Sequence, residues 1–202
     1  MINLGLINNL IELAVKAWLK SITNRIQIKT LNIVTNNKIK RNIKELYLEA
    51  KDLIYQNLYL NEIKIKIYNC TFRLNYNNYL IYSDNLIINC SLMIDNENLE
   101  NIFFASKWDS FKVRMQEVFA ESNHISNLVI NDKFINLNYK KNNIDIVIPI
   151  SIYLEGNLIY LENINVEERL HLPFDKNIKF KSCEIKNKQI NLDFLSKVIF
   201  DS

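Results

Sequence analysis

The stretch KDLIYQNLYLNEIKIKIYNC, residues 51–70, decides the fold class because its apolar side chains return at every second position. Successive side chains of a β-strand point to opposite faces of a sheet, so this period predicts strands. The apolar positions change from even to odd numbers along the stretch: Leu58, Leu60, Ile63, Ile65 and Ile67. We therefore expect a bulge or a tight bend near Asn61 and Glu62 that brings all of them to one face.

The same pattern continues along the chain and is clearest in residues 144–154. Aliphatic side chains occupy every second position there: Ile144, Ile146, Ile148, Ile150, Ile152 and Leu154. Pro149 interrupts the run and has no N–H group for a neighbouring strand, so we expect an edge position or a bulge. Near the C-terminus, Asn187 and Lys188 are predicted to form the turn of a β-hairpin.

Two helices are predicted from a different spacing. Residues 3–23 carry polar side chains at spacings of three and four, which leaves a narrow polar stripe on a mostly enclosed helix. A second helix is expected from Asn96 to Ser122, capped by Asp95 or Asn96. Its apolar stripe comprises Phe104, Trp108, Phe111, Met115 and Val118. Packing on a sheet is the simplest explanation of such a stripe, and the lining of a ligand site is the second.

The order of these elements predicts the architecture. The 202 residues, 49% of them hydrophobic, are enough to bury a core, and no Pro- or Gly-rich linker divides them. We expect an α+β fold in a single domain, residues 1–202. In this fold a long curved antiparallel sheet wraps around the N-terminal amphipathic helix, and the second helix follows the first set of strands.

Composition and motifs exclude several classes of function. Two glycines cannot build a Gly-rich phosphate loop, which excludes P-loop and dinucleotide-binding proteins. A formal charge of +3, spread along the chain, argues against nucleic acid as a partner. His124 and His171 lack a metal-ligand pattern, and no acidic pair has the partners of a general acid and base. We therefore expect no enzyme, no catalytic residue, no metal and no cofactor.

Cysteine spacing and the N-terminus bear on the compartment. Cys70, Cys90 and Cys183 form no CxxC motif, and three reduced thiols packed in strands are favoured over one disulfide and a free thiol. This indicates a reducing compartment. The first residues lack the basic region of a secretory signal, and no run of about 18 apolar residues predicts a membrane-spanning helix. We expect a protein that is not secreted.

One basic cluster stands out in the sequence: Lys38, Lys40, Arg41 and Lys44. A solvated loop is its simplest explanation, and attraction to anionic lipid head groups is the functional alternative. Nucleic acid is the weaker interpretation, because no aromatic side chains interleave with the basic ones as stacking platforms.

The long strands and two helices carry more apolar surface than a simple core needs. A curved sheet around a helix would bury it and can leave a slot for acyl chains, where each buried methylene contributes about 0.8 kcal/mol. The candidate lining residues of this slot come from both helices: Leu10, Ile11, Ala14, Trp18, Phe104, Trp108, Phe111 and Met115.

Four stretches carry a resemblance to the LmeA-like phospholipid-binding family of cyanobacteria, actinobacteria and some plastids. They are LAVKAWLKS (13–21), LEAKDLIYQNLYLNEIKI (48–65), INCSLMIDNENLENIFFASKW (88–108) and LHLPFDKNIKFKSCEIKNKQINL (170–192). In order, they resemble the family's opening helix, its central strand–turn–strand, the strand entering the second helix, and the closing strand and hairpin. Asn57 and Asn187 stand where glycine is common in the family, and Asn tolerates left-handed backbone.

The resemblance implies a TULIP-like fold and a non-enzymatic function. We expect binding or transfer of a membrane phospholipid or glycolipid in an apolar groove at a membrane surface. The Ile- and Asn-rich composition is typical of AT-rich plastid or small bacterial genomes. It favours a protein of the cytoplasm or plastid stroma that lies on a membrane such as the thylakoid. The alternative is a structural or assembly factor with a filled core, which docks on a membrane protein complex through a protein partner.

Overall fold

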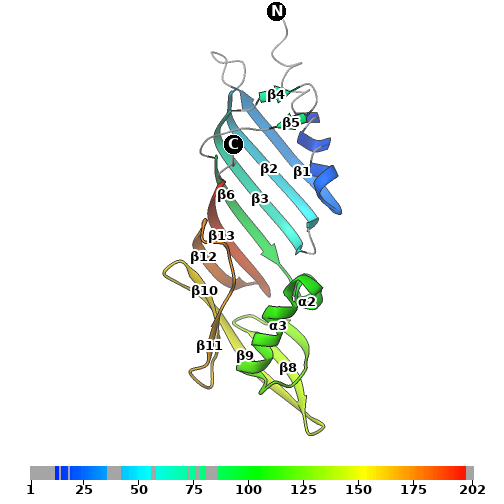
Figure 1. Ribbon diagram of the computed structural model, residues 1–202, viewed down its shortest axis with the longest axis vertical. Helices are drawn as coiled ribbons and strands as arrows, with labels where there is room; N and C mark the ends of the chain where they lie inside the picture. Colours follow the sequence, from blue (N-terminus) through cyan, green and yellow to red (C-terminus); the bar gives the residue numbers. More distant parts are fainter. Residues whose placement is uncertain are drawn as a thin grey trace, which may run out of the picture.

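The strands form two main antiparallel sheets in the computed structural model, which describes residues 12–13, 15–17, 19–35, 42–55, 58–71, 73–75, 78–80 and 86–198 (Figure 1). The larger sheet has six strands in the spatial order β1 (Arg25–Thr35), β2 (Asn42–Tyr55), β3 (Leu58–Thr71), β6 (Leu86–Ile94), β13 (Gln189–Val198) and β12 (Ile178–Lys186). The smaller sheet has five, in the order β11 (Arg169–His171), β10 (Leu158–Asn163), β9 (Ile144–Glu155), β8 (Ile135–Lys141) and β7 (Ile125–Ile130). A separate pair consists of β4 (Arg73–Asn75) and β5 (Asn78–Leu80).

Short helices join and flank the sheets. After β6 the chain enters α2 (Asn96–Phe104), a 3-10 turn η1 (Ser106–Trp108) and α3 (Asp109–Phe119), which connect the two sheets (Figure 1). Another helix, described at residues 12–13, 15–17 and 19–22, lies beside β1. None of the described helices is long and apolar enough to cross a membrane. The α+β class with curved antiparallel sheets is confirmed, while a TULIP-like sheet that wraps around the first helix stays a prediction.

The last two strands of the chain return to the first sheet. β13 pairs with β6 and carries β12 at the outer edge, so Leu192 lies opposite both Leu92 and Cys183. β3 pairs with the other side of β6, where Ile63 lies opposite Leu92. The C-terminal hairpin therefore extends a sheet whose other strands precede the helices.

Apolar residues on both sides of the parity switch in residues 51–70 reach the same core, as predicted, but β3 shows no register shift near Asn61 and Glu62. Leu60 and Ile63 are 2% and 8% exposed and belong to the same core. The pairing of β2 with β3 runs from Lys51 and Glu62 to Leu53 and Leu60 without a register shift. Asp52 of β2 has a positive φ of 49°. Asp52 lies between the Lys51–Glu62 and Leu53–Leu60 pairs, where the buried residues of β2 also change parity, from Ala50 to Leu53.

Asparagine turns close two hairpins. Asn187 and Lys188 have φ values of 53° and 56°, the conformation of a type I′ turn, which confirms the predicted turn between β12 and β13. Asn142 and Asn143, with φ values of 52° and 63°, close the β8–β9 hairpin in the same way. Asn supplies the left-handed conformations that glycine supplies in most hairpins.

The prediction of an edge position or bulge at Pro149 is wrong. β9 lies between β10 and β8, and its pairing with both is continuous. The last paired residue of β10 is Asn163, opposite Ile150, and the Ile164 N–H donates to the Pro149 carbonyl at 3.1 Å. The missing N–H of Pro149 therefore faces the end of β10, where no strand residue needs it.

The second predicted helix is divided in two. Asp95 caps it as expected, since its side chain accepts from the Asn98 N–H at 3.0 Å. Ala105 then takes an extended conformation with ψ of 135°, which ends α2 and reorients the chain before α3. The buried residues of the two helices are Phe103, Met115 and Phe119. The expected continuous stripe through Phe104 is therefore wrong, because the break changes which helical face points to the sheets.

Two clusters of buried residues form the core. The main cluster joins both sheets with α2 and α3, and includes Leu60, Leu92, Phe103, Leu137 and Ile159. A second cluster forms where Val15 and Leu19 of the first helix pack on β1 and β2. The shared main cluster ties the two sheets into one packed unit.

Candidate functional site

The six-stranded sheet has one apolar face built from three rows of directly opposite residues. The rows are Ile28, Ala50, Ile63, Leu92, Leu192 and Cys183; then Leu31, Leu48, Ile65, Cys90, Phe194 and Phe180; then Ile33, Leu46, Ile67, Ile88, Ser196 and Ile178. Ser196 is the single polar member of these rows. Because alternate residues of a strand share a face, the sequence period of two produces this surface directly.

The first helix covers only part of the apolar face. Val15 and Leu19 pack with Leu31, Leu46 and Leu48 of β1 and β2. Most of the third row is half-buried, and we call these residues the half-buried row: Ile33, Ile67, Ile88, Ser196 and Ile178. Ile33, Ile67 and Ile88 pack against the cluster that contains Val15 and Leu19, yet they stay partly exposed. The apolar face therefore retains surface that the described residues do not enclose.

Most of the predicted lining and basic residues cannot be placed on this face. Those outside the described residues are Leu10, Ile11, Ala14, Trp18, Lys38, Lys40 and Arg41. Lys44 is the described member of the basic cluster and is exposed on β2.

The four predicted lining residues of the second helix do not share one groove. Met115 is 3% exposed and belongs to the main core, against which the half-buried Phe111 packs. Trp108 meets Phe111 edge to face, with ring centroids 6.3 Å apart, and its buried Nε1 has no hydrogen-bond partner among the described residues. Phe104 is 40% exposed and lines a separate hollow of about 560 Å³ beside Tyr59. The break at Ala105 separates Phe104 from Met115.

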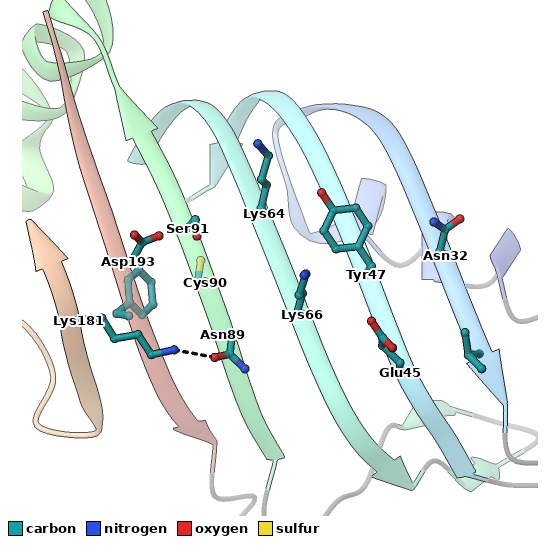
Figure 2. A pocket seen from close by; sticks show the side chains of 12 residues that line it. Asn32, Glu45, Tyr47, Lys64, Lys66, Asn89, Cys90, Ser91, Lys181 and Asp193 are labelled. Atoms are coloured by element: carbon teal, nitrogen blue, oxygen red, sulfur yellow. Dashed lines mark hydrogen bonds between the residues drawn. The ribbon is translucent and has the colours of Figure 1, made fainter. Parts of the chain in front are cut away.

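The opposite face of the six-stranded sheet is polar and holds a trough of about 710 Å³ (Figure 2). All six strands contribute to its lining: Asn32, Val34, Glu45, Tyr47, Lys64, Lys66, Asn89, Ser91, Lys181 and Asp193. Cys90 and Phe194 of the second apolar row also border the trough. One row across the sheet places Asn32, Tyr47, Lys66 and Asn89 directly opposite one another. Pockets of about 300–1,000 Å³ are typical of small-ligand sites.

Several charged groups of the trough are already paired. The Lys64 ammonium lies 2.7 Å from the Glu62 carboxylate, and this hydrogen bond lowers the pKa of Glu62 and raises the pKa of Lys64. The Tyr47 hydroxyl donates to Glu49 at 3.0 Å, and burial with this bond raises the pKa of Tyr47. These contacts hold one side of the trough in a fixed arrangement.

Lysines at the centre of the trough have different partners. The Lys66 ammonium lies 5.5 Å from the centre of the Tyr47 ring, and Lys181 donates to the Asn89 side-chain oxygen at 3.0 Å. Neither forms an ion pair with a described carboxylate. Sequence reasoning missed this group, although the alternation of Lys64 and Lys66 in residues 51–70 was its local signal.

The histidines lie at the surface. His124 is exposed after α3, and His171 is exposed on β11, with its ring centre 6.4 Å from that of Tyr160. Both match the expected surface histidines. Across the described ranges, no three His, Cys, Asp or Glu side chains gather as a metal site would require.

The described thiols are reduced. Cys90 and Cys183 are free cysteines on β6 and β12, as expected, and the Cys70 side chain lies outside the described residues. Burial raises the pKa of both thiols to about 12. Their reactivity in the native fold should be low, because the thiolate is the nucleophile.

We expect Cys90 to resist a thiol reagent in the native protein at pH 8 and to react fully in denaturant. Its pKa is raised from 9.0 to about 12 in the fold, so the unfolded chain loses its proton first as pH rises. The buried, protonated Cys90 thiol therefore makes its full contribution to the free energy of unfolding below pH 9. That contribution declines between pH 9 and 12. Timed labelling followed by peptide mass spectrometry checks this; rapid native labelling of the Cys90 peptide contradicts it.

No protein-family model, curated protein or solved structure matches the chain.

Proposed function

We propose that this chain is a non-enzymatic lipid-binding protein whose apolar sheet face contacts the acyl chains of a phospholipid or glycolipid. The supporting observation is the half-buried row, which lies on a face without charged residues in its three rows. Its isoleucines stay partly exposed, although three of them pack against the cluster that contains the first helix. In this proposal the sheet curves around the helix in a TULIP-like manner and the row forms one wall of the groove.

The energetic basis of the proposal is burial of apolar surface. Each methylene removed from water contributes about 0.8 kcal/mol. Isoleucines that remain half-buried after folding leave apolar surface in contact with water. An acyl chain can cover this surface, and the strands that carry the isoleucines are already ordered. Ile67 and Ile88 lie directly opposite each other on β3 and β6, so an extended acyl chain can contact both strands.

Attachment to a membrane surface forms the second part of the proposal. The described part of the first helix exposes Leu13 by 63% and Ile22 by 41%. Exposed Lys20 lies on the same helix, while Lys16 pairs with Glu12 at 2.6 Å. Apolar and basic side chains on the exposed side of this helix suit the boundary between acyl chains and anionic head groups.

The neighbouring isoleucines of β6 provide a matched test. Ile88 is half-buried in the row, whereas Ile87 is 50% exposed on the opposite face. We expect Ile88→Asn to reduce uptake of a fluorescent phospholipid from vesicles by about tenfold, a factor that corresponds to about 1.4 kcal/mol. A bound acyl chain would bury the new amide without a hydrogen-bond partner, which costs at least that much. Ile87→Asn should leave uptake unchanged.

Controls decide the outcome. Circular dichroism melting of both variants shows whether a loss of uptake reflects loss of the fold. Lipid extracted from the purified wild-type chain and identified by mass spectrometry supports the proposal. It is overturned if the wild-type chain neither carries lipid nor takes it up, or if both substitutions reduce uptake equally.

An assembly factor with a filled core is the second candidate function. Tight packing of the main core favours it, since Leu137, Ile159 and Ala120 are fully buried there. A protein partner that remains bound in stoichiometric amount after detergent removes lipid, and that Ile88→Asn releases, would support this candidate over lipid binding.

A further inference from the structure

The polar trough lies on the face of the sheet opposite the half-buried row (Figure 2). We propose that it binds a phosphate-type oxyanion through Lys66, Lys181 and Asn89. The proposal does not rest on lipid binding, because Lys66, Lys181 and Asn89 belong to none of the three apolar rows. Lys66 lies between Ile65 and Ile67 in the chain, and its side chain points to the other side of the sheet.

Strand pairing brings the three residues together. Lys66 of β3 is directly opposite Asn89 of β6. Lys181 lies at the register shift between Phe180 and Ser182 of β12, and its side chain extends across β13 to reach Asn89. Lys181 therefore contacts Asn89 from the β12 side, while Lys66 stands on β3, on the other side of Asn89, with its ammonium turned toward Tyr47 (Figure 2).

The ion pairs and hydrogen bonds of the trough show which donors remain available to a ligand. Lys64 is compensated by Glu62, and Asp193 accepts from the Ser182 hydroxyl at 2.8 Å. Lys66 and Lys181 lack a carboxylate partner within the part of the chain that the structure describes. Asn89 uses its oxygen for Lys181, which directs its NH₂ group away from that lysine and leaves it as a donor. Two ammonium groups and an amide donor suit the oxygens of a phosphate group.

The neighbours of these donors limit their freedom. The Tyr47 ring faces the Lys66 ammonium at 5.5 Å and restricts where it lies. Glu45 also lines the trough, on the β2 side, and its carboxylate opposes an anion there. The proposal therefore predicts opposite effects for two neutralising substitutions, since removal of the Glu45 charge should tighten binding and removal of the Lys66 charge should weaken it.

The experiment uses the full chain and two probes of the same chemistry. Inorganic pyrophosphate is titrated by calorimetry, and phosphatidylcholine vesicles with and without phosphatidylglycerol are tested by flotation. We expect saturable binding to at least one probe. Lys66→Gln and Lys181→Gln should each raise Kd about tenfold, equivalent to about 1.4 kcal/mol, and Glu45→Gln should lower Kd about twofold. Lys133→Gln, an exposed lysine beside the five-stranded sheet, is the matched charge control.

The outcomes distinguish a soluble phosphorylated ligand from a lipid head group, and they test the trough proposal separately from the lipid-binding proposal. Lysine-dependent binding of pyrophosphate alone assigns the site to soluble phosphorylated compounds, and lysine-dependent flotation assigns it to lipid head groups. The proposal is overturned if neither probe binds, or if Lys133→Gln weakens binding as much as Lys66→Gln does. Ile88→Asn changes the apolar face and should leave pyrophosphate binding intact. The lipid proposal can therefore fail while the trough proposal holds, and the reverse. Both trough lysines are exposed, and unchanged melting verifies that their variants fold.

Discussion

Leu137→Ala is expected to lower the free energy of unfolding by about 2–5 kcal/mol, the range for removing a buried leucine side chain. Leu137 is 0% exposed on β8, where Leu128 of β7 and Ile148 of β9 lie directly opposite. Both neighbours are held by strand pairing, so the sheet cannot close the cavity that the substitution leaves. Chemical denaturation followed by circular dichroism measures the change.

The control for this prediction is Ile144→Ala on the adjacent strand. Ile144 is 64% exposed at the start of β9, and its truncation should change stability by less than about 0.5 kcal/mol. A shared core also predicts that Leu137→Ala shifts one unfolding transition for both sheets. Two separate transitions, with only one shifted, would show that the sheets unfold independently.

Asp95→Ala is expected to destabilise the protein by about 2–4 kcal/mol, because one side chain satisfies two structural needs. Asp95 accepts from the Asn98 N–H at the start of α2 and also accepts from the Asn61 side-chain amide of β3. The Asp95 N–H donates to the Asn61 side-chain oxygen at 2.7 Å. Alanine would remove the helix cap and leave the half-buried Asn61 amide without its partner.

The matched variant separates these contributions. Asp95→Asn retains a side-chain oxygen for the cap, so it should cost about 1 kcal/mol or less in helix capping. Asn61→Ala removes only the link from β3 to α2. Equal unfolding free energies for Asp95→Ala and the wild-type chain would show that this junction does not hold α2 against the sheet.

The junction at Asp95 also explains how the two proposed sites keep their places. It fixes the point where the chain leaves the six-stranded sheet and enters the helices. Asn96 adds a second link, since its side-chain oxygen accepts from the Ile130 N–H and its amide donates to the Ile130 carbonyl. The helices therefore pack on the main core and stay away from both the half-buried row and the trough.

Local features of the sequence predicted much of the secondary structure. The period of two produced β2, β3 and β9, the Asp95 cap and the Asn187–Lys188 turn were located correctly, and the thiols were expected in strands. Each of these features depends on residues that lie within a few positions of one another in the sequence. The break at Ala105 was missed, because the stripe from Phe104 to Val118 satisfies helical spacing and only packing against two sheets favours the reorientation.

The sequence by itself determined that this chain would form antiparallel strands with one apolar and one polar side, since side-chain alternation is a property of each strand. Only the tertiary structure decided which strands became neighbours. Lys181 and Asn89 are 92 positions apart, and the trough exists because β12 and β13 return to β6. The same pairing completes the apolar rows on the other face. Contacts between distant segments depend on the sum of many weak packing and pairing energies, which no local pattern contains.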